Sequence, residues 1–459
     1  MEGEEVNNKQ TDFYGKFEFK GKSYPFFYKD SVVTIIQQPW EYNKDFKDVT
    51  EVEKIEGLTN SNKVIVFLQC KFRGGSYKEI FSNIIFSTKG FILFDKCDCP
   101  FECIEFESEA LNTFYPPIQL IDKEALLDEG AYKVKKYDET TQHFETLVNY
   151  EKIKMELSIP WIFNLQPENR TIGEKYSVWR MIFETPKQSE NIVKYYLYLL
   201  DFLIFVNFRK NVTIEHFKLY RIINSEYVKV GIGKFFSNQS GFDAKAEKSI
   251  IFNDLTKEEL SRLFSCIAMQ RKENSYNDSY IPQRTIKYHS FNWIDWLNTA
   301  LSFEGEYCKK YKDLKAQNDP QFAVAKEEIL KLIDNKIIES GVSKNNKKNS
   351  AWLKFKHLIE HTDTRLEEKF AFSLNHFSDE INAIKEQLLK KMELSDDINL
   401  SYEYANYRNH LAHGDIVSMD DANIVNFSIM RMFIYCFILE RADISKATRK
   451  RIVEKLFYI

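Results

Sequence analysis

Hydrophobic residues follow two different periods along this chain, and the change between them limits the folds that it can adopt. Up to about residue 285 they form short runs such as "KVIVFLQCKF" and "GFILF", separated by turn signals such as "RGG" and "TKG". Short runs rich in valine, isoleucine and phenylalanine are typical of strands. After about residue 290 the pattern is that of long helices. The sequence therefore predicts an α+β protein, in which a β-rich region with packed helices precedes an all-helical bundle.

The predicted domains follow from this change of pattern. At 459 residues the chain is longer than one hydrophobic core usually serves. A polar segment at 272–284 lies where the strand pattern ends, and it has the composition of a loop. We therefore expect a β-rich N-terminal domain at residues 1–285 and an α-helical bundle at residues 286–459.

Several of the expected helices have recognisable ends. In the first domain, Ser189 is a candidate N-cap for a helix that runs to about residue 208. Thr256 and Glu259 form a capping box for a second helix at 256–272. In the second domain, a basic loop "SKNNKKNS" occupies 343–350. The helices expected around it lie at about 320–340, 365–392, 418–442 and after Ser445.

Charge and compartment narrow the possible functions. The chain has 64 basic and 68 acidic residues, so no global field would gather nucleic acid or an anionic membrane, and any polyanion site must be local. The first ten residues are acidic and polar, unlike a signal peptide, so we expect a cytoplasmic protein. The apolar run at 192–208 is short for a membrane span and carries Lys194 and Asp201, which predicts a buried helix and no membrane partner.

The stretch "YANYRNHLAHGDI", residues 404–416, is predicted to end a helix. Tyr404, Tyr407 and Leu411 have the spacing of a buried helical stripe. Gly414 suits the left-handed residue that follows a helix. The polar residues of the stretch therefore come together in the last turns of this helix.

Three of those polar residues suit the cleavage of RNA without a metal. Asn409 and His413 are four residues apart and share a face, and the long side chain of Arg408 can reach the same place. The 2′-hydroxyl of the substrate would attack the neighbouring phosphorus while a histidine moves a proton and an arginine holds the phosphate oxygens. An asparagine can orient either group because it both donates and accepts.

The motif "YRNHLAHG" within a C-terminal helical bundle resembles the Arg-Asn-x-x-x-His signature of HEPN domains, which are helical ribonucleases of bacterial toxin and antiviral systems. The order of parts, with a β-rich domain first, resembles the ApeA-like abortive-infection proteins. The resemblance implies a homodimer that brings two copies of the motif together across a cleft. It also implies metal-independent endoribonuclease activity against RNA, with no cofactor.

Carried over by position, the resemblance implies that Arg408, Asn409 and His413 are catalytic. His410 falls at a variable position, where it would either contact phosphate or simply be exposed. The resemblance also suggests that a phage-derived protein, sensed by the N-terminal domain, releases the nuclease and so halts growth. Two alternatives stay open: a non-catalytic HEPN scaffold that binds a nucleotide, an RNA or a protein, and a metal-dependent nuclease.

Other polar clusters are open to more than one interpretation. The basic residues Lys344, Lys347 and Lys348 would contact the RNA backbone or form an ordinary solvated face. A second Arg-x-x-x-x-His pattern, from Arg284 to His289, lacks both the asparagine and the terminating glycine. We therefore do not expect it to be a site.

Two groups of residues are possible metal ligands. Cys97, Cys99 and Cys103, with Cys70 as a fourth, have irregular spacing for zinc, and reduced thiols are the favoured interpretation. The segment "HLIEHTD" contains His357, His361 and Asp363 but lacks the glutamate of a zinc-protease motif. A surface or interface pair of histidines is favoured there.

Overall fold

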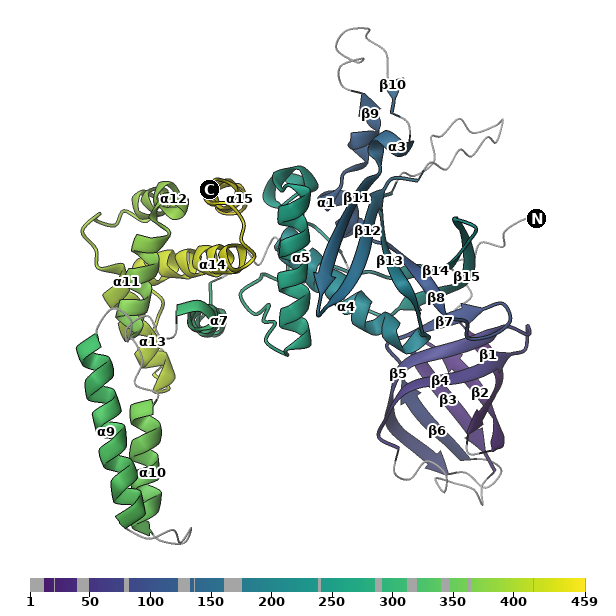
Figure 1. The fold of residues 1–459 in the computed structure, drawn as a ribbon, viewed down its shortest axis with the longest axis horizontal. Coiled ribbons are helices and arrows are strands. Elements are labelled where there is room, and N and C mark those ends of the chain that lie inside the picture. Colours follow the sequence, from purple (N-terminus) through teal and green to yellow (C-terminus); the bar gives the residue numbers. More distant parts are fainter. Residues whose placement is uncertain are drawn as a thin grey trace. The chain divides into compact units, whose positions relative to one another are not determined.

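The computed structural model separates into two compact units, Met1–Tyr288 and His289–Ile459 (Figure 1). The first is rich in strands, whereas none of the described residues of the second lies in a strand. The predicted α+β class is therefore confirmed. The predicted boundary falls within 285–290, outside the described residues. The residues that the structure describes are 12–19, 21–38, 49–77, 82–122, 133–135, 137–160, 176–237, 241–284, 291–311, 320–339, 347–360, 365–415 and 417–458.

Six strands of the first unit close into a barrel. The strand order β5-β4-β1-β2-β3-β6 returns to β5, because β5 pairs with β6 as well as with β4. The 14-residue β5 is long enough to do this, since it pairs with β7 through its first residues and with β6 through its last. The barrel strands are β1 Phe13–Phe19, β2 Lys22–Lys29, β3 Val32–Gln37, β4 Glu51–Thr59, β5 Val64–Tyr77 and β6 Ser82–Ser87.

The same sheet continues beyond the barrel as an open antiparallel sheet, in the order β11-β12-β13-β8-β14-β15-β7. The predicted strands "KVIVFLQCKF" and "GFILF" form most of β5 and all of β7. The shorter elements are the helices α1 Glu109–Phe114 and α3 Tyr137–Thr140 and a two-stranded sheet of β9 Ile121–Asp122 and β10 Lys133–Val134. The open strands are β7 Gly90–Phe94, β8 Phe101–Glu107, β11 Gln142–Val148, β12 Glu151–Ser158, β13 Val178–Lys187, β14 His216–Ile223 and β15 Glu226–Phe235.

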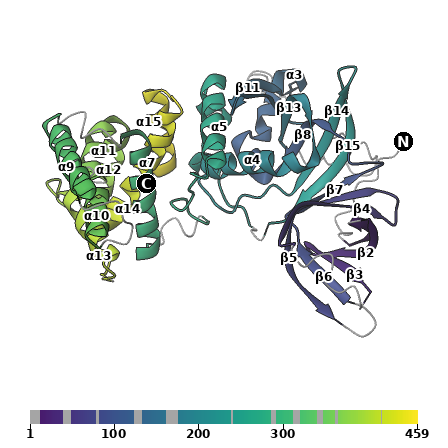
Figure 2. The same cartoon turned by 60° about the horizontal axis from the view of Figure 1, so that its bottom comes forward.

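Two helices, α4 Ile192–Asn207 and α5 Lys257–Lys272, pack on the open sheet (Figure 2). The ring of Trp179 on β13 lies 5.4 Å from Phe202 of α4 and 5.6 Å from Phe264 of α5, so aromatic packing joins both helices to the strands. Asp201 of α4 is fully buried and pairs with Arg271 of α5. The apolar run at 192–208 is therefore a buried helix, as predicted.

One predicted helix start is confirmed and one is wrong. Thr256 and Glu259 form both bonds of the capping box at the start of α5, each 3.1 Å long. Ser189 does not cap α4, which begins at Ile192 after a short 3-10 turn. The Ser189 hydroxyl instead donates to Asp98, 2.7 Å away, because a buried carboxylate from a distant loop reaches it.

The second unit consists of helices around α14. Eleven consecutive residues, 429–439, are buried in α14, which packs against α7, α12, α13 and α15. It is the one helix within the described ranges that is long and apolar enough to cross a membrane, but 89% of its apolar window is buried in the unit, as in a core helix. The helices are α7 Trp293–Tyr311, α9 Pro320–Glu339, α10 Lys347–Glu360, α11 Leu366–His376, α12 Ser378–Lys391, α13 Leu400–Ala412, α14 Asp421–Arg441 and α15 Lys446–Phe457.

Two predicted elements of this unit need correction. The helix expected at 365–392 is two helices, because the chain breaks at Phe377, whose buried ring packs 4.9 Å from Phe437 of α14. The basic loop expected at 343–350 is also wrong in part, since Lys347 and Lys348 are the first residues of α10. Lys344 lies outside the described residues.

Candidate functional site

The helix that carries the Arg-Asn-x-x-x-His motif, α13, has well-formed ends. It begins at Asn399, whose side chain accepts a 3.1 Å hydrogen bond from the backbone of Tyr402. Gly414, which follows the C-cap residue His413, has a left-handed φ of 87°. The backbone amides of Gly414 and Asp415 donate to the carbonyls of Leu411 and His410, which is the Schellman arrangement. The predicted role of Gly414 is confirmed.

A buried stripe fixes the rotation of α13 about its axis. Tyr404, Tyr407 and Leu411 are 0%, 4% and 7% exposed, as their spacing predicts. The Tyr404 ring stacks on Phe370 of α11 at 4.7 Å, and the Tyr407 ring meets the edge of Trp296 of α7 at 4.8 Å. With these rings held inside, the opposite face of α13 is turned to solvent.

Arg408 lies at the border between the buried stripe and the exposed face. Its Nε donates to Glu304 Oε1 of α7 at 3.0 Å, and its Nη2 donates to Glu304 Oε2 at 3.3 Å. The Tyr404 hydroxyl donates to the same carboxylate at 3.2 Å. Burial, followed by the charge of Glu304, raises the pKa of Tyr404 well above its usual value, so the hydroxyl keeps its proton. The Tyr404 hydroxyl therefore helps to fix the Glu304 carboxylate, and this carboxylate in turn holds the Arg408 guanidinium.

Asn409 and His413 lie on the exposed face of α13. Among the residues that the structure describes, neither side chain has a hydrogen-bond partner. His413 is the C-cap residue of α13. The sequence led us to expect that Arg408 could reach the same place. In this structure its side chain is paired with α7 instead, and no contact between described atoms joins it to the His413 ring.

His410 is exposed and has a local partner. Its Nδ1 lies 3.2 Å from Asp415 Oδ2, just beyond the end of the helix. An anion would have to compete with this carboxylate for the imidazole. The predicted contact of His410 with phosphate therefore stays a prediction, and so do the RNA contacts of Lys344, Lys347 and Lys348.

Glu304 is the member of this cluster that the sequence did not reveal. It stands on α7 next to the buried Phe303, in a helix with two other acidic residues, Asp295 and Glu306. Its partner Arg408 is 104 positions away in the chain. The local sequence therefore does not identify this partner.

The four cysteines considered as zinc ligands do not form a metal site. Cys70 and Cys103 are fully buried in strands, and burial raises the pKa of Cys70 to about 12 and that of Cys103 further. Cys97 and Cys99 lie in the loop between β7 and β8. Within the described ranges, no three histidine, cysteine or acidic side chains are grouped to hold a metal ion.

The remaining sequence candidates fall partly outside the structure. His361, Asp363 and His289 lie outside the described residues. His357 is in α10, but its side chain is not described. The predictions for these residues therefore stay predictions.

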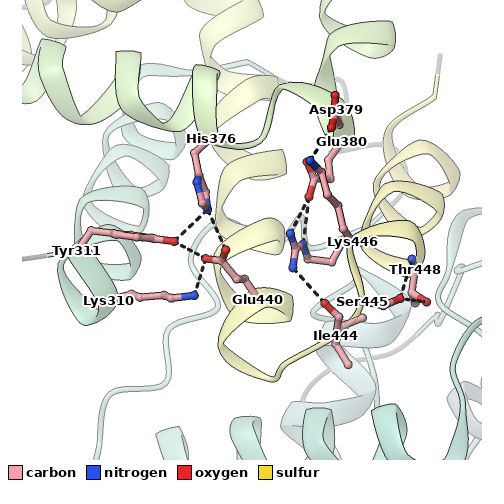
Figure 3. Close-up of polar contacts among 11 residues, drawn as sticks. Lys310, Tyr311, His376, Asp379, Glu380, Glu440, Ile444, Ser445, Lys446 and Thr448 are labelled. Atoms are coloured by element: carbon pink, nitrogen blue, oxygen red, sulfur yellow. Dashed lines mark hydrogen bonds and ion pairs between the residues drawn. The ribbon is translucent and has the colours of Figure 1, made fainter. Parts of the chain in front are cut away.

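A second polar cluster lies near the C-terminal ends of α7, α11 and α14 (Figure 3). Glu440 accepts from the Tyr311 hydroxyl at 2.6 Å, pairs with Lys310 at 2.9 Å and lies 2.8 Å from His376 Nε2. Burial raises the pKa of Glu440, but the hydrogen bonds from Tyr311, Lys310 and His376 outweigh it, and the pKa is lowered overall. This cluster joins three helix ends and leaves its carboxylate well satisfied.

Comparison with known protein families, with curated proteins and with solved structures finds no match for this chain. The functional assignment therefore depends on the residues of α13 and their surroundings.

Proposed function

We propose that this chain is a cytoplasmic anti-phage abortive-infection effector, a HEPN-type endoribonuclease that cleaves RNA without a metal at a site shared by two copies. The supporting observation is the end of α13, where the exposed side chains of Asn409 and His413 have no partner among the described residues and the same helix carries a guanidinium held by Glu304. The β-rich unit would sense the trigger, for which a phage-derived protein is the candidate.

The proposed reaction needs only the ribose and two proton carriers. The 2′-oxygen attacks the adjacent phosphorus as His413 takes its proton, and the bond from phosphorus to the 5′-oxygen breaks. The leaving 5′-oxygen takes a proton from the same histidine of a second copy. The products are a 2′,3′-cyclic phosphate and a free 5′-hydroxyl.

Arg408 would stabilise the charge that builds up on the phosphate. Its guanidinium has five N–H donors, and Glu304 accepts from Nε and Nη2. The donors that remain can bind two phosphate oxygens while Glu304 holds the group in place. A fixed cation costs less reorganisation in the transition state than a mobile one.

Two features favour a site made by two copies. Arg408 and His413 project from different sides of α13, so one chain offers them in separate directions. Ile294 and Leu301 of α7 are 51% and 49% exposed, and Leu301 lies about one helical turn before Glu304. Apolar side chains of this size, seven residues apart on one helix face, suit burial against a second copy.

The non-catalytic scaffold is favoured by one specific observation. Arg408, Glu304 and Tyr404 form a brace between α13 and α7, and such a brace would be useful for stability alone. Arg408→Lys separates the catalytic role from the stabilising role, because lysine keeps the positive charge but loses the planar set of N–H donors of the guanidinium. If cleavage depends on the guanidinium donors, the rate of RNA cleavage by the folded Arg408→Lys variant should be at least about tenfold lower than that of the parent.

The direct test measures RNA decay by the purified chain with and without EDTA, and the chemical nature of the new ends. We expect activity in EDTA, cyclic phosphate ends, and loss of activity in His413→Ala and Arg408→Ala. His143→Ala is the matched control, because His143 is an exposed histidine of the other unit, with 67% of its side chain exposed. Activity in both site variants equal to the parent would exclude this site, and activity abolished by EDTA would favour a metal-dependent nuclease.

A further inference from the structure

Asp98 anchors the loop between β7 and β8 from two sides. Its carboxylate is 8% exposed and pairs with Lys54 of β4 at 2.8 Å. It also accepts from the Ser189 hydroxyl, before α4, at 2.7 Å. The loop is thereby tied both to the barrel and to the helix that covers the open sheet.

The anchored aspartate stands between two cysteines. The chain bends at residues 95–97, and this bend brings the side chains of Cys97 and Cys99 together beside the anchored Asp98. Cys97 is exposed and Cys99 is half-buried. Their sulfur atoms are only 2.6 Å apart, whereas a disulfide bond is about 2.0 Å long. The backbone therefore already holds the two thiols side by side.

We propose that Cys97 and Cys99 form a reversible dithiol–disulfide couple that exchanges with low-molecular-weight disulfides of the glutathione class. A metal is a poorer occupant, because two thiolates alone make an incomplete zinc site and the part of the chain that the structure describes supplies no third ligand. The proposal is independent of the proposed ribonuclease activity.

The exchange has two steps. The exposed Cys97 thiolate attacks one sulfur of the small disulfide, which forms a mixed disulfide and releases one small thiolate. Cys99 then loses its proton and attacks the Cys97 sulfur, which closes the protein disulfide and releases the second small thiolate. Two electrons pass from the protein to the small disulfide, and the two thiol protons pass to the released thiolates.

The surroundings suit this order of attack. The hydrogen bond with Cys97, then burial, raises the pKa of Cys99 to about 11, so Cys99 keeps its proton while Cys97 reacts first. The guanidinium of Arg221 on β14 acts in the opposite direction and favours the Cys99 thiolate. An exposed attacking sulfur and a partly covered second sulfur are typical of exchanging pairs.

The other cysteines offer no comparable pair among the described residues. Cys70, Cys103 and Cys436 are buried, and burial raises the pKa of each. Cys266 and Cys308 are half-buried and stand on separate helices, α5 and α7. Of the seven cysteines of the chain, the couple would therefore use two and leave five reduced.

The test equilibrates the full chain with mixtures of glutathione and glutathione disulfide, followed by acid quenching, alkylation and peptide mass analysis. We expect the peptide with Cys97 and Cys99 to lose two hydrogens while the other five of the seven cysteines are alkylated. Cys99→Ser should trap glutathione on Cys97, and Cys97→Ser should abolish the rapid reaction. Cys266→Ser is the matched control and should behave as the parent.

A variant of Asp98, which ties the loop to Lys54 and Ser189, provides a further test. Asp98→Ala frees the loop, so the oxidised fraction at a given glutathione ratio should fall about tenfold, because the thiols are no longer held together. Circular dichroism checks that each variant is folded. Two results would overturn the proposal: full alkylation of both thiols in every mixture, or a bound metal in the parent that protects them.

Discussion

Histidines at two places in the helical unit have opposite surroundings. His376 Nε2 lies 3.0 Å from the Tyr311 hydroxyl and 2.8 Å from Glu440 (Figure 3). The ring of His376 also stacks on Phe372, with 5.2 Å between the ring centroids. The His413 side chain is exposed, and within the described ranges nothing bonds to it. A histidine whose ring nitrogen is bound by neighbouring side chains, as in His376, stabilises the fold, whereas a histidine without such partners, as in His413, is available to a substrate.

Two arginines of the helical unit, Arg449 and Arg408, also differ in how deeply their ion pairs are buried, but to a smaller degree. Arg449 of α15 has 13% of its side chain exposed and pairs with Glu380, which is 1% exposed. Arg408 and Glu304 are 23% and 17% exposed. The first pair is sealed inside the unit, and the second is within reach of an anion. The comparison therefore separates residues that hold the bundle from residues that face the proposed site.

The largest expected effect is on His413. If it moves the protons of the reaction, His413→Ala should lower the cleavage rate by about 10³-fold, while its free energy of unfolding changes by less than about 0.5 kcal/mol. His376→Ala should do the reverse, with lower stability and an unchanged rate per folded molecule. Cleavage kinetics and denaturant melts on both variants measure the split. Equal effects of the two variants on both quantities would remove the distinction between the two histidines.

The next effect concerns the sealed arginine. Arg449→Ala leaves the buried Glu380 carboxylate without its partner, so the free energy of unfolding should fall by about 3 kcal/mol. Cleavage per folded molecule should not change. Lys446→Ala is the control, because Lys446 and Asp379 lie in the same region but are 57% and 66% exposed, and we expect no measurable loss of stability. A loss in the control as large as in Arg449→Ala would contradict the argument from burial.

A pH-dependent effect is expected at Glu440. Its pKa is lower in the folded protein than its ordinary value of 4.5, so its contribution to stability is present above that value and is lost as the pH falls through the folded pKa. Glu440→Gln should therefore cost about 2 kcal/mol at neutral pH. The difference from the parent should shrink below about pH 4.5. Urea melts across this pH range measure it, and a constant difference would show that the charge of Glu440 is not what matters.

The two clusters also show which parts of the molecule a sequence can predict. The capping box of Thr256 and Glu259 and the end of α13 at Gly414 involve residues within five positions of each other, so spacing alone revealed them. The pairs Glu304 with Arg408 and His376 with Glu440 join residues 104 and 64 positions apart. No local pattern specifies such pairs.

The errors have the same origin. Ser189 has the chemistry of an N-cap, but its hydroxyl binds Asp98, 91 positions away. The segment 365–392 has a continuous helical pattern, but Phe377 breaks it by packing against α14. In each case a tertiary contact overrides a local preference. The type of each residue was readable, and its partner was not.

The smallest effect tests the end of α13 that carries His413. Gly414 has a φ of 87°, and a Cβ there would meet no atom within 4 Å, so Gly414→Ala adds backbone strain without a clash. We expect a loss of about 1 kcal/mol and a modest loss of cleavage as the last turn shifts. Gly305→Ala is the opposite control. Gly305 lies inside α7 with equally open space and ordinary helical backbone, so alanine should stabilise the unit by about 0.5–1 kcal/mol. Stabilisation by both substitutions would mean that the left-handed turn after His413 is absent in solution, and the exposed position of that histidine would lose its structural basis.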